Sequence, residues 1–198
     1  MFKAAFYVAL LCSAMAARAD QTNWSGPYQA CDNRSELFKT GHMDLGIRID
    51  TKNPDIAAAF RRAVAFWSSV LDMSYREDAS SACALALVDG TPALLNEAQT
   101  VARAQFTDLP NFQGWIAFDA HASEYMSADE IYATAVHELG HIFGLRHNPR
   151  ASSVMYYLDC DGTSQLDETD LQALATRHAV RPGHRKSIPV LQQVLAKK

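Results

Sequence analysis

Residues 137–147 read His137-Glu138-Leu139-Gly140-His141-Ile142-Phe143-Gly144-Leu145-Arg146-His147. Side chains four residues apart project from the same face of an α-helix, so His137 and His141 can direct two imidazoles at one metal ion. Glu138 follows the first histidine, where its carboxylate reaches a metal-bound water without being a ligand. Gly144 can adopt the left-handed conformation that ends a helix, so that the chain turns back and delivers His147 as a third ligand.

This set of donors indicates zinc. Three neutral imidazoles leave the fourth position of a tetrahedral zinc ion open, as catalytic rather than structural zinc sites do. A helical histidine by itself is more often a packed or surface residue than a ligand, and it is the joint spacing that favours zinc. The sequence therefore predicts one catalytic Zn²⁺ on His137, His141 and His147, with Glu138 as the general base.

Residues 1–19 have the pattern of a secretory signal peptide. Lys3 supplies a positive start, residues 4–15 form an apolar run, and Ala17-Arg18-Ala19 is a small-x-small cleavage site. The run is too short to span a bilayer comfortably, and no later segment is apolar enough to cross one. We therefore expect a secreted protein, extracellular or periplasmic.

The composition is that of one globular domain with an acidic balance. The chain has 198 residues, 48% of them hydrophobic and 20% charged. Cleavage after residue 19 removes Lys3 and Arg18, which leaves 16 of the 18 basic side chains against 22 acidic ones. A net charge of about −6 argues against nucleic acid as a partner. Nothing in the sequence requires an oligomer, so we expect a monomer.

Three cysteines remain after that cleavage, Cys31, Cys83 and Cys160. In an oxidising compartment they allow one disulfide and one free thiol, and the sequence leaves the pairing open. Cys83 lies in the apolar run 82–88, which is a usual setting for a buried free cysteine. The pair Cys31–Cys160 is then weakly favoured.

The first part of the domain is predicted to be a strand followed by a long helix. Residues 44–50 alternate apolar and polar side chains, as a half-buried strand does. Asn53 and Pro54 are a helix cap and a first helical residue. The apolar positions then repeat at helical spacing to about residue 73, and they are Ile56, Phe60, Ala63, Val64, Trp67 and Leu71. We assign this face to the core, without a function for Trp67.

Shorter strands are expected downstream at residues 73–77, 83–88 and 114–119. Residues 94–106 have only weak helical periodicity. The order of strand, helix and strands before the motif helix fits an α+β domain with helices packed on a twisted sheet.

Two capping boxes mark the later helices. Ser127, with Glu130 three residues on, is predicted to start the motif helix, which ends at Gly144. Asp167, with Asp170 at the third helical position, is predicted to start a last helix that runs to about residue 178.

The motif resembles that of the metzincin superfamily of zinc endopeptidases, and its surroundings are most similar to the matrixin branch. Metzincins carry a tight turn with a methionine under the zinc site. Ser152-Ser153-Val154-Met155-Tyr156 is similar to that turn, which makes Met155 the expected Met-turn residue. Residues 166–171 resemble the start of the matrixin C-terminal helix. The resemblance covers about residues 44–180.

This resemblance implies a metzincin-like zincin fold: a mostly parallel sheet of about five strands, three main helices, and a cleft between a large N-terminal and a small C-terminal lobe. It also implies hydrolysis of a protein or peptide, in which Glu138 takes a proton from the zinc-bound water and returns it to the leaving amine. By the same analogy, an extended substrate pairs with an edge strand formed by Trp115, Ile116, Ala117 and Phe118.

The sequence departs from matrixins where these often hold further ions. Ala117 stands two residues before Asp119, where histidine is usual, and residues 89–114 lack an acidic, glycine-rich loop. Asp119, His121 and Glu124 offer donor atoms but are more simply explained as surface residues. A structural calcium or second zinc ion stays open.

Other departures leave the branch open. Tyr157 stands two residues after Met155, where astacin-like enzymes place a tyrosine that reaches the zinc or the oxyanion; a tyrosine packed in the site wall has the same spacing. Asn148, which follows the third histidine, matches none of the subfamily markers well. The residues around Cys31 do not resemble a cysteine switch, so a disulfide is favoured over occlusion of the zinc by Cys31 or Asp32.

These patterns divide the chain into a signal peptide (1–19), an N-terminal loop region (20–43), a metallopeptidase catalytic domain (44–180) and a basic C-terminal tail (181–198). The expected function is that of a secreted zinc-dependent endopeptidase. The alternative is a non-catalytic, secreted zinc- or protein-binding module on the same scaffold, against which the intact Glu138 argues. A third hypothesis, hydrolysis of a non-protein amide, would use the same zinc and glutamate.

Overall fold

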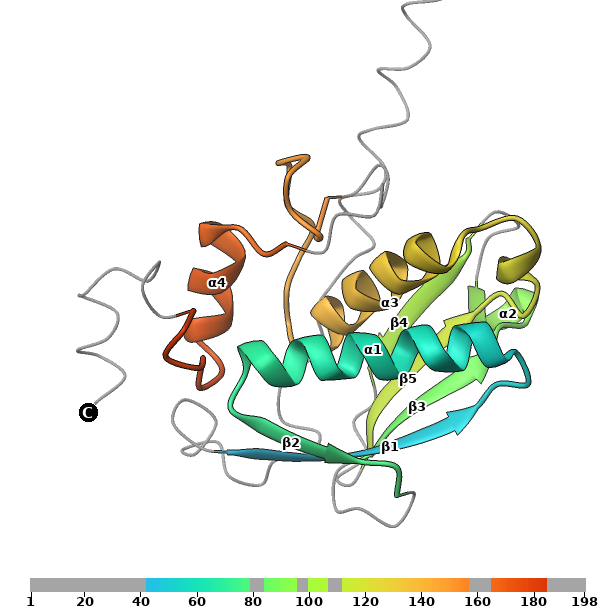
Figure 1. Ribbon diagram of the computed structural model, residues 1–198, viewed down its shortest axis with the longest axis horizontal. Coiled ribbons are helices and arrows are strands. Elements are labelled where there is room, and N and C mark those ends of the chain that lie inside the picture. The colour runs from blue at the N-terminus through green and yellow to red at the C-terminus, as the bar shows by residue number, and fades with distance from the viewer. Residues whose placement is uncertain (1–41, 79–83, 96–99, 107–111, 157–164, 185–198) are drawn as a thin grey trace, which may run out of the picture.

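The computed structural model describes residues 42–78, 84–95, 100–106, 112–156 and 165–184 (Figure 1). The elements in chain order are β1 (Met43–Asp50), α1 (Pro54–Val70), β2 (Met73–Arg76), β3 (Ala84–Asp89), α2 (Pro92–Leu95), β4 (Ala102–Phe106), β5 (Phe112–Phe118), the 3₁₀ turn η2 (Ala122–Glu124), α3 (Ala128–Ile142) and α4 (Glu168–Ala175). The expected α+β fold is confirmed. Tyr157, the cysteines and the proposed signal peptide lie outside the described residues.

The five strands form one sheet in the order β2-β1-β3-β5-β4. The first four are parallel, and β4 runs antiparallel to β5. The central strand β3 is buried along Ala84–Leu87, as expected of a parallel strand with both faces covered. β2 and β4 are therefore the two edges of the sheet.

The prediction that residues 115–119 form the substrate-pairing edge is wrong. Trp115, Ile116, Ala117 and Phe118 belong to β5, which pairs on one side with β3 and on the other with β4. The sequence pattern of residues 94–106 is weakly helical and gives no indication of the edge strand. In the structure only Pro92–Leu95 is helical, and Ala102–Phe106 forms the edge strand β4. Two alanines, an arginine and a glutamine give β4 little strand propensity, and pairing with β5 overrides it.

Helix α1 forms where its caps and apolar face predict. The Asn53 side chain accepts hydrogen bonds from the backbone N–H groups of Asp55 and Ile56, and Pro54 is the first helical residue. All six apolar positions predicted for its core face are buried, and Trp67 donates its indole N–H to the backbone carbonyl of Val136 at 3.1 Å. That bond joins α1 to α3, and the two helices pack on each other over the sheet (Figure 1).

Helix α4 lies beyond one end of α1, away from α2 (Figure 1). It starts at the predicted capping box, in which Asp167 and Asp170 each accept a hydrogen bond from the other's backbone N–H. It ends at Ala175, three residues before the predicted end. The segment after it is tied to α1, because the Arg181 guanidinium donates to the carbonyl oxygens of Ser68 and Met73.

Candidate metal centre

The three histidines of the motif converge at one point. His137 and His141 lie one turn apart on α3, which starts at the predicted capping box of Ser127 and Glu130. His147 follows the end of the helix, and its ring centroid lies 5.2 Å from that of His137 and 5.0 Å from that of His141. One nitrogen from each ring lies within 4.8 Å of the other two. The predicted ligands are thus brought together.

The turn at Gly144 produces this convergence. Gly144 has a φ of 91°, in the left-handed region that suits glycine. Its N–H bonds to the His141 carbonyl at 2.9 Å, and the Leu145 N–H bonds to the Gly140 carbonyl at 2.8 Å. These bonds satisfy carbonyl groups at the end of α3 while the chain reverses, which places His147 opposite the helix.

Backbone carbonyls fix which nitrogen of two histidines faces the site. Nδ1 of His137 lies 2.7 Å from the Val154 carbonyl oxygen, and Nδ1 of His141 lies 2.9 Å from that of Leu145. A carbonyl only accepts, so each Nδ1 carries the hydrogen and Nε2 of a neutral ring keeps its lone pair. Burial lowers the pKa of His141 to about 3, which keeps this ring neutral as a metal ligand must be.

The spacing of these nitrogens fits zinc. Nε2 of His137 and Nε2 of His141 lie 3.1 Å apart. Two nitrogens on one tetrahedral zinc ion, each at about 2.0–2.1 Å, are separated by roughly 3.3 Å. Two lone pairs that face each other at this distance are stabilised by a shared cation, so this pair of nitrogens matches the spacing that a zinc ion requires.

Glu138 points from α3 toward the edge of the sheet. Its Oε2 accepts a hydrogen bond of 2.7 Å from the backbone N–H of Ala104 on β4. Loss of solvent raises the pKa of Glu138, while the hydrogen bond from Ala104 and the charge of Arg103 act in the opposite direction. A partly buried carboxylate with a raised pKa is suited to accept and release a proton.

Met155 is fully buried against Gly140 of α3, and sequence reasoning missed the role of this glycine in making room for it. A Cβ atom added to Gly140 would lie 2.4 Å from the Met155 sulfur and 3.3 Å from Cζ2 of Trp67. Gly140 is therefore needed for the close approach of α3 to Met155. The sequence showed it as one of two variable positions between the histidines, and only the packing partner reveals its role.

The sequence profile of the matrixin family matches residues 43–179. The chain belongs to the matrixin family. It is 30% identical over 128 residues to metalloendoproteinase 1-MMP of Arabidopsis thaliana, which covers 58% of this chain and 35% of that protein. It is 29% identical over 129 residues to matrix metalloproteinase-21 of Cynops pyrrhogaster, covering 58% of this chain and 20% of that protein. The chain thus spans about a third or less of these relatives.

Membership of the matrixin family implies zinc. The three histidines, His137, His141 and His147, are placed so that they could hold a metal ion. Within the described ranges, they are the one group of three or more histidine, cysteine or acidic side chains placed to do so. Asp119, His121 and Glu124 are not part of such a group: His121 pairs with Glu124 at 2.7 Å, and Asp119 accepts a hydrogen bond from Tyr125 at 2.6 Å.

Among the helices that the structure describes, none combines the length and the hydropathy that a membrane span requires.

Proposed function

We propose that this matrixin is a secreted zinc-dependent endopeptidase. The observation that carries the proposal is the meeting of the histidine triad with the Glu138 carboxylate, which is itself held by the edge strand β4. A metal site, a base and a strand at the edge of the described sheet, brought to one place, are the parts that hydrolysis of an extended peptide needs.

His137, His141 and His147 would hold the zinc ion through nitrogens that their backbone contacts and the turn at Gly144 direct inward. When bound, zinc supplies Lewis acidity that activates a water molecule and polarises the substrate carbonyl. Met155 is the proposed Met-turn residue, and it is buried close to Gly140, which lies between the two helical histidines in the chain.

Glu138 is the proposed general base. The Ala104 N–H holds its Oε2, and Oε1 is the oxygen that we assign to proton transfer. It takes a proton from the attacking water and then gives it to the leaving amine, so the carboxylate is restored at the end of each turnover. A role for Tyr157 in stabilising the oxyanion stays a prediction.

The substrate is proposed to pair with β4 rather than with β5. Alternate residues of an antiparallel edge strand direct their N–H and C=O groups away from the partner strand. The Ala104 N–H shows this outward direction, since it bonds to Glu138. An extended peptide that adds to this edge would pass directly in front of the proposed base.

Secretion is proposed from the first nineteen residues, whose positive start, apolar run and small-x-small site follow the order of a signal peptide. The mature chain would then begin near Asp20. The N-terminal sequence of the protein recovered from the culture medium of an expressing cell tests this directly. Recovery of an uncleaved chain inside the cell would contradict it.

A mixed peptide library tests the activity. We expect the zinc-loaded chain to cleave it and the variant Glu138→Gln to lose about 10²- to 10⁴-fold in rate, the usual share of a general base. Glutamine keeps the shape and still accepts from Ala104, so zinc binding should persist. If neither protein cleaves although both bind zinc, the peptidase proposal fails and the binding-module alternative replaces it.

A further inference from the structure

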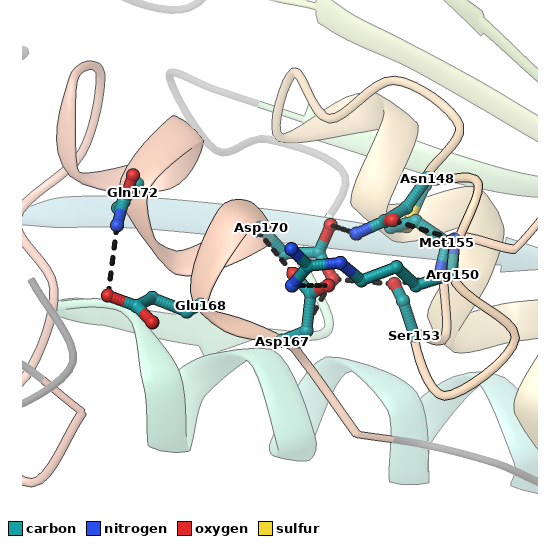
Figure 2. Close-up of polar contacts among 8 residues, drawn as sticks. All are labelled: Asn148, Arg150, Ser153, Met155, Asp167, Glu168, Asp170 and Gln172. Atoms are coloured by element: carbon teal, nitrogen blue, oxygen red, sulfur yellow. Dashed lines mark hydrogen bonds and ion pairs between the residues drawn. The ribbon is translucent and has the colours of Figure 1, made fainter.

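A buried carboxylate joins helix α4 to the segment that follows the metal motif. Asp170 is buried, and its Oδ1 accepts a hydrogen bond of 2.9 Å from Nδ2 of Asn148. Its Oδ2 accepts from the hydroxyl of Ser153 at 2.6 Å and from the backbone N–H of Asp167 at 3.1 Å. Figure 2 shows Asn148 and Ser153 converging on Asp170 from the same side.

Both of these residues hold Met155 as well. The Asn148 backbone N–H donates to the Met155 carbonyl at 2.7 Å. The Met155 N–H in turn donates to Oγ of Ser153 at 2.9 Å, the same hydroxyl that donates to Asp170 (Figure 2). Within the segment 148–155, Asn148 and Ser153 are therefore each bonded to Met155. Their side chains also both donate to the carboxylate of Asp170.

The anchored segment is bounded by groups of the metal site. Asn148 directly follows the third histidine, His147, in the sequence. Val154, between Ser153 and Met155, supplies the carbonyl that accepts from Nδ1 of His137. A shift of this segment would move the third ligand and release the contact that orients the first one.

We propose that Asp170 is a positioning residue for the metal site, acting through Asn148 on His147 and through Ser153 on Met155 and Val154. The inference rests on the proposed zinc binding and assigns to the α4 carboxylate a role that the helix cap alone does not require. Within the cap the Asp170 carboxylate accepts only from the Asp167 backbone N–H, whereas the two bonds from Asn148 and Ser153 lie outside the cap.

The chemistry calls for a carboxylate at this place. Asp170 accepts three hydrogen bonds and donates none with its side chain, which an ionised carboxyl does and an amide cannot. An asparagine of the same shape would turn an NH₂ group toward at least one donor. Outer contacts of this kind orient metal ligands, and their loss typically weakens metal binding by about 10- to 100-fold.

The test is the zinc affinity of Asp170→Asn, measured by competition with a chromophoric chelator. The matched control is Glu168→Gln, the same carboxyl-to-amide change on the first turn of α4, where Glu168 accepts from Gln172 on the surface. We expect Asp170→Asn to bind zinc about 10- to 100-fold more weakly and to change the visible absorption of the Co²⁺-substituted protein. Glu168→Gln should match the native chain in both measurements.

Circular dichroism of the metal-free proteins separates positioning from unfolding. If Asp170→Asn does not fold, Asn148→Ala and Ser153→Ala decide the question, since each removes one bond to Asp170 and leaves the two backbone bonds of the cap intact. Each also removes one bond within the segment, from Arg150 N–H to Asn148 or from Met155 N–H to Ser153. We expect each to weaken zinc binding and shift the cobalt spectrum. Native zinc affinity and an unchanged spectrum in a folded Asp170→Asn, or in both alanine variants, would overturn the proposal. A chain that binds zinc but cleaves no peptide would refute the proposed function alone.

Discussion

The backbone N–H of Ala104 donates a 2.7 Å hydrogen bond to Oε2 of Glu138. Ala104 lies in the edge strand β4, opposite Ile116 of β5, while Glu138 lies on α3 next to the first predicted ligand. The outward N–H of a strand edge thus fixes one oxygen of the proposed base. The edge that would receive a substrate is thus hydrogen-bonded to the proposed base that would activate the attacking water.

Pairing of substrate with β4 predicts an alternating pattern of backbone dependence. In an antiparallel or parallel added strand, only every second peptide group faces the edge. We expect N-methylation of alternate substrate amides to lower kcat/KM by about 5- to 150-fold, which corresponds to about 1–3 kcal/mol for a lost hydrogen bond. N-methylation at the intervening positions should be tolerated. A peptide series with one N-methyl group each measures this. Equal tolerance at all positions would rule out strand pairing.

The variant Gly140→Ala should be destabilised. Alanine normally stabilises a helix relative to glycine by about 1 kcal/mol, but here its methyl group would meet the Met155 sulfur and the Trp67 ring. We expect the free energy of unfolding in urea to fall by about 1–3 kcal/mol, the usual effect of overpacking.

Met155→Ala supplies the matching control. In the double variant with Gly140→Ala the two changes should be less than additive, because the shortened side chain makes room for the methyl group. An increase in stability for Gly140→Ala alone would contradict the close contact.

Zinc should stabilise the native chain more than the variant His147→Ala. A ligand at 100 times its Kd adds about 2.7 kcal/mol to the free energy of unfolding when it binds only the folded state. Loss of one of three ligands should reduce this gain to below about 1 kcal/mol at the same zinc concentration. His121→Ala, which removes an exposed histidine outside the triad, is the control and should keep the full gain. Equal gains in all three proteins would exclude His147 as a ligand.

His178 makes stability depend on pH. The ring is buried near Phe143 and its Nε2 donates to the Phe143 carbonyl at 2.8 Å. Burial lowers its pKa to about 4, against about 6.5 in the unfolded chain. The unfolded state therefore takes up the proton first, and stability is full above about pH 6.5 and is lost as the pH falls toward 4.

The variant His178→Gln measures this contribution. Glutamine does not titrate and can still donate to Phe143. We expect the difference in unfolding free energy between pH 7 and pH 4 to shrink by about 2–3 kcal/mol relative to the native chain. Parallel pH profiles of the two proteins would show that His178 is not a buried neutral ring.

Features set by neighbouring residues could be predicted from the sequence. The Asn53 cap, the capping boxes at Ser127 and Asp167, and the turn at Gly144 all rest on contacts within a few residues, and each is present. The same holds for the convergence of the three histidines, because helical spacing and one turn produce it.

Features set by distant partners could not be predicted. The edge position of β4 depends on which strands pair, and its alanine-rich sequence carries no sign of an open edge. Gly140 is constrained by Met155 and Trp67, which reach it from other parts of the chain. Asp170 was recognised as a helix-cap residue, but its bond to Asn148, 22 residues away, follows only from the packing of α4.

A zinc titration of the metal-free chain tests the central claim most directly. A peptide cut by the native protein serves as the reporter, and the initial cleavage rate is measured as zinc is added. We predict no cleavage without metal and a rate that rises to a plateau at one zinc ion per chain, with Glu138→Gln binding the same ion but cleaving about 10²- to 10⁴-fold more slowly. Cleavage that persists without zinc, or that proceeds at the native rate in Glu138→Gln, would contradict the account.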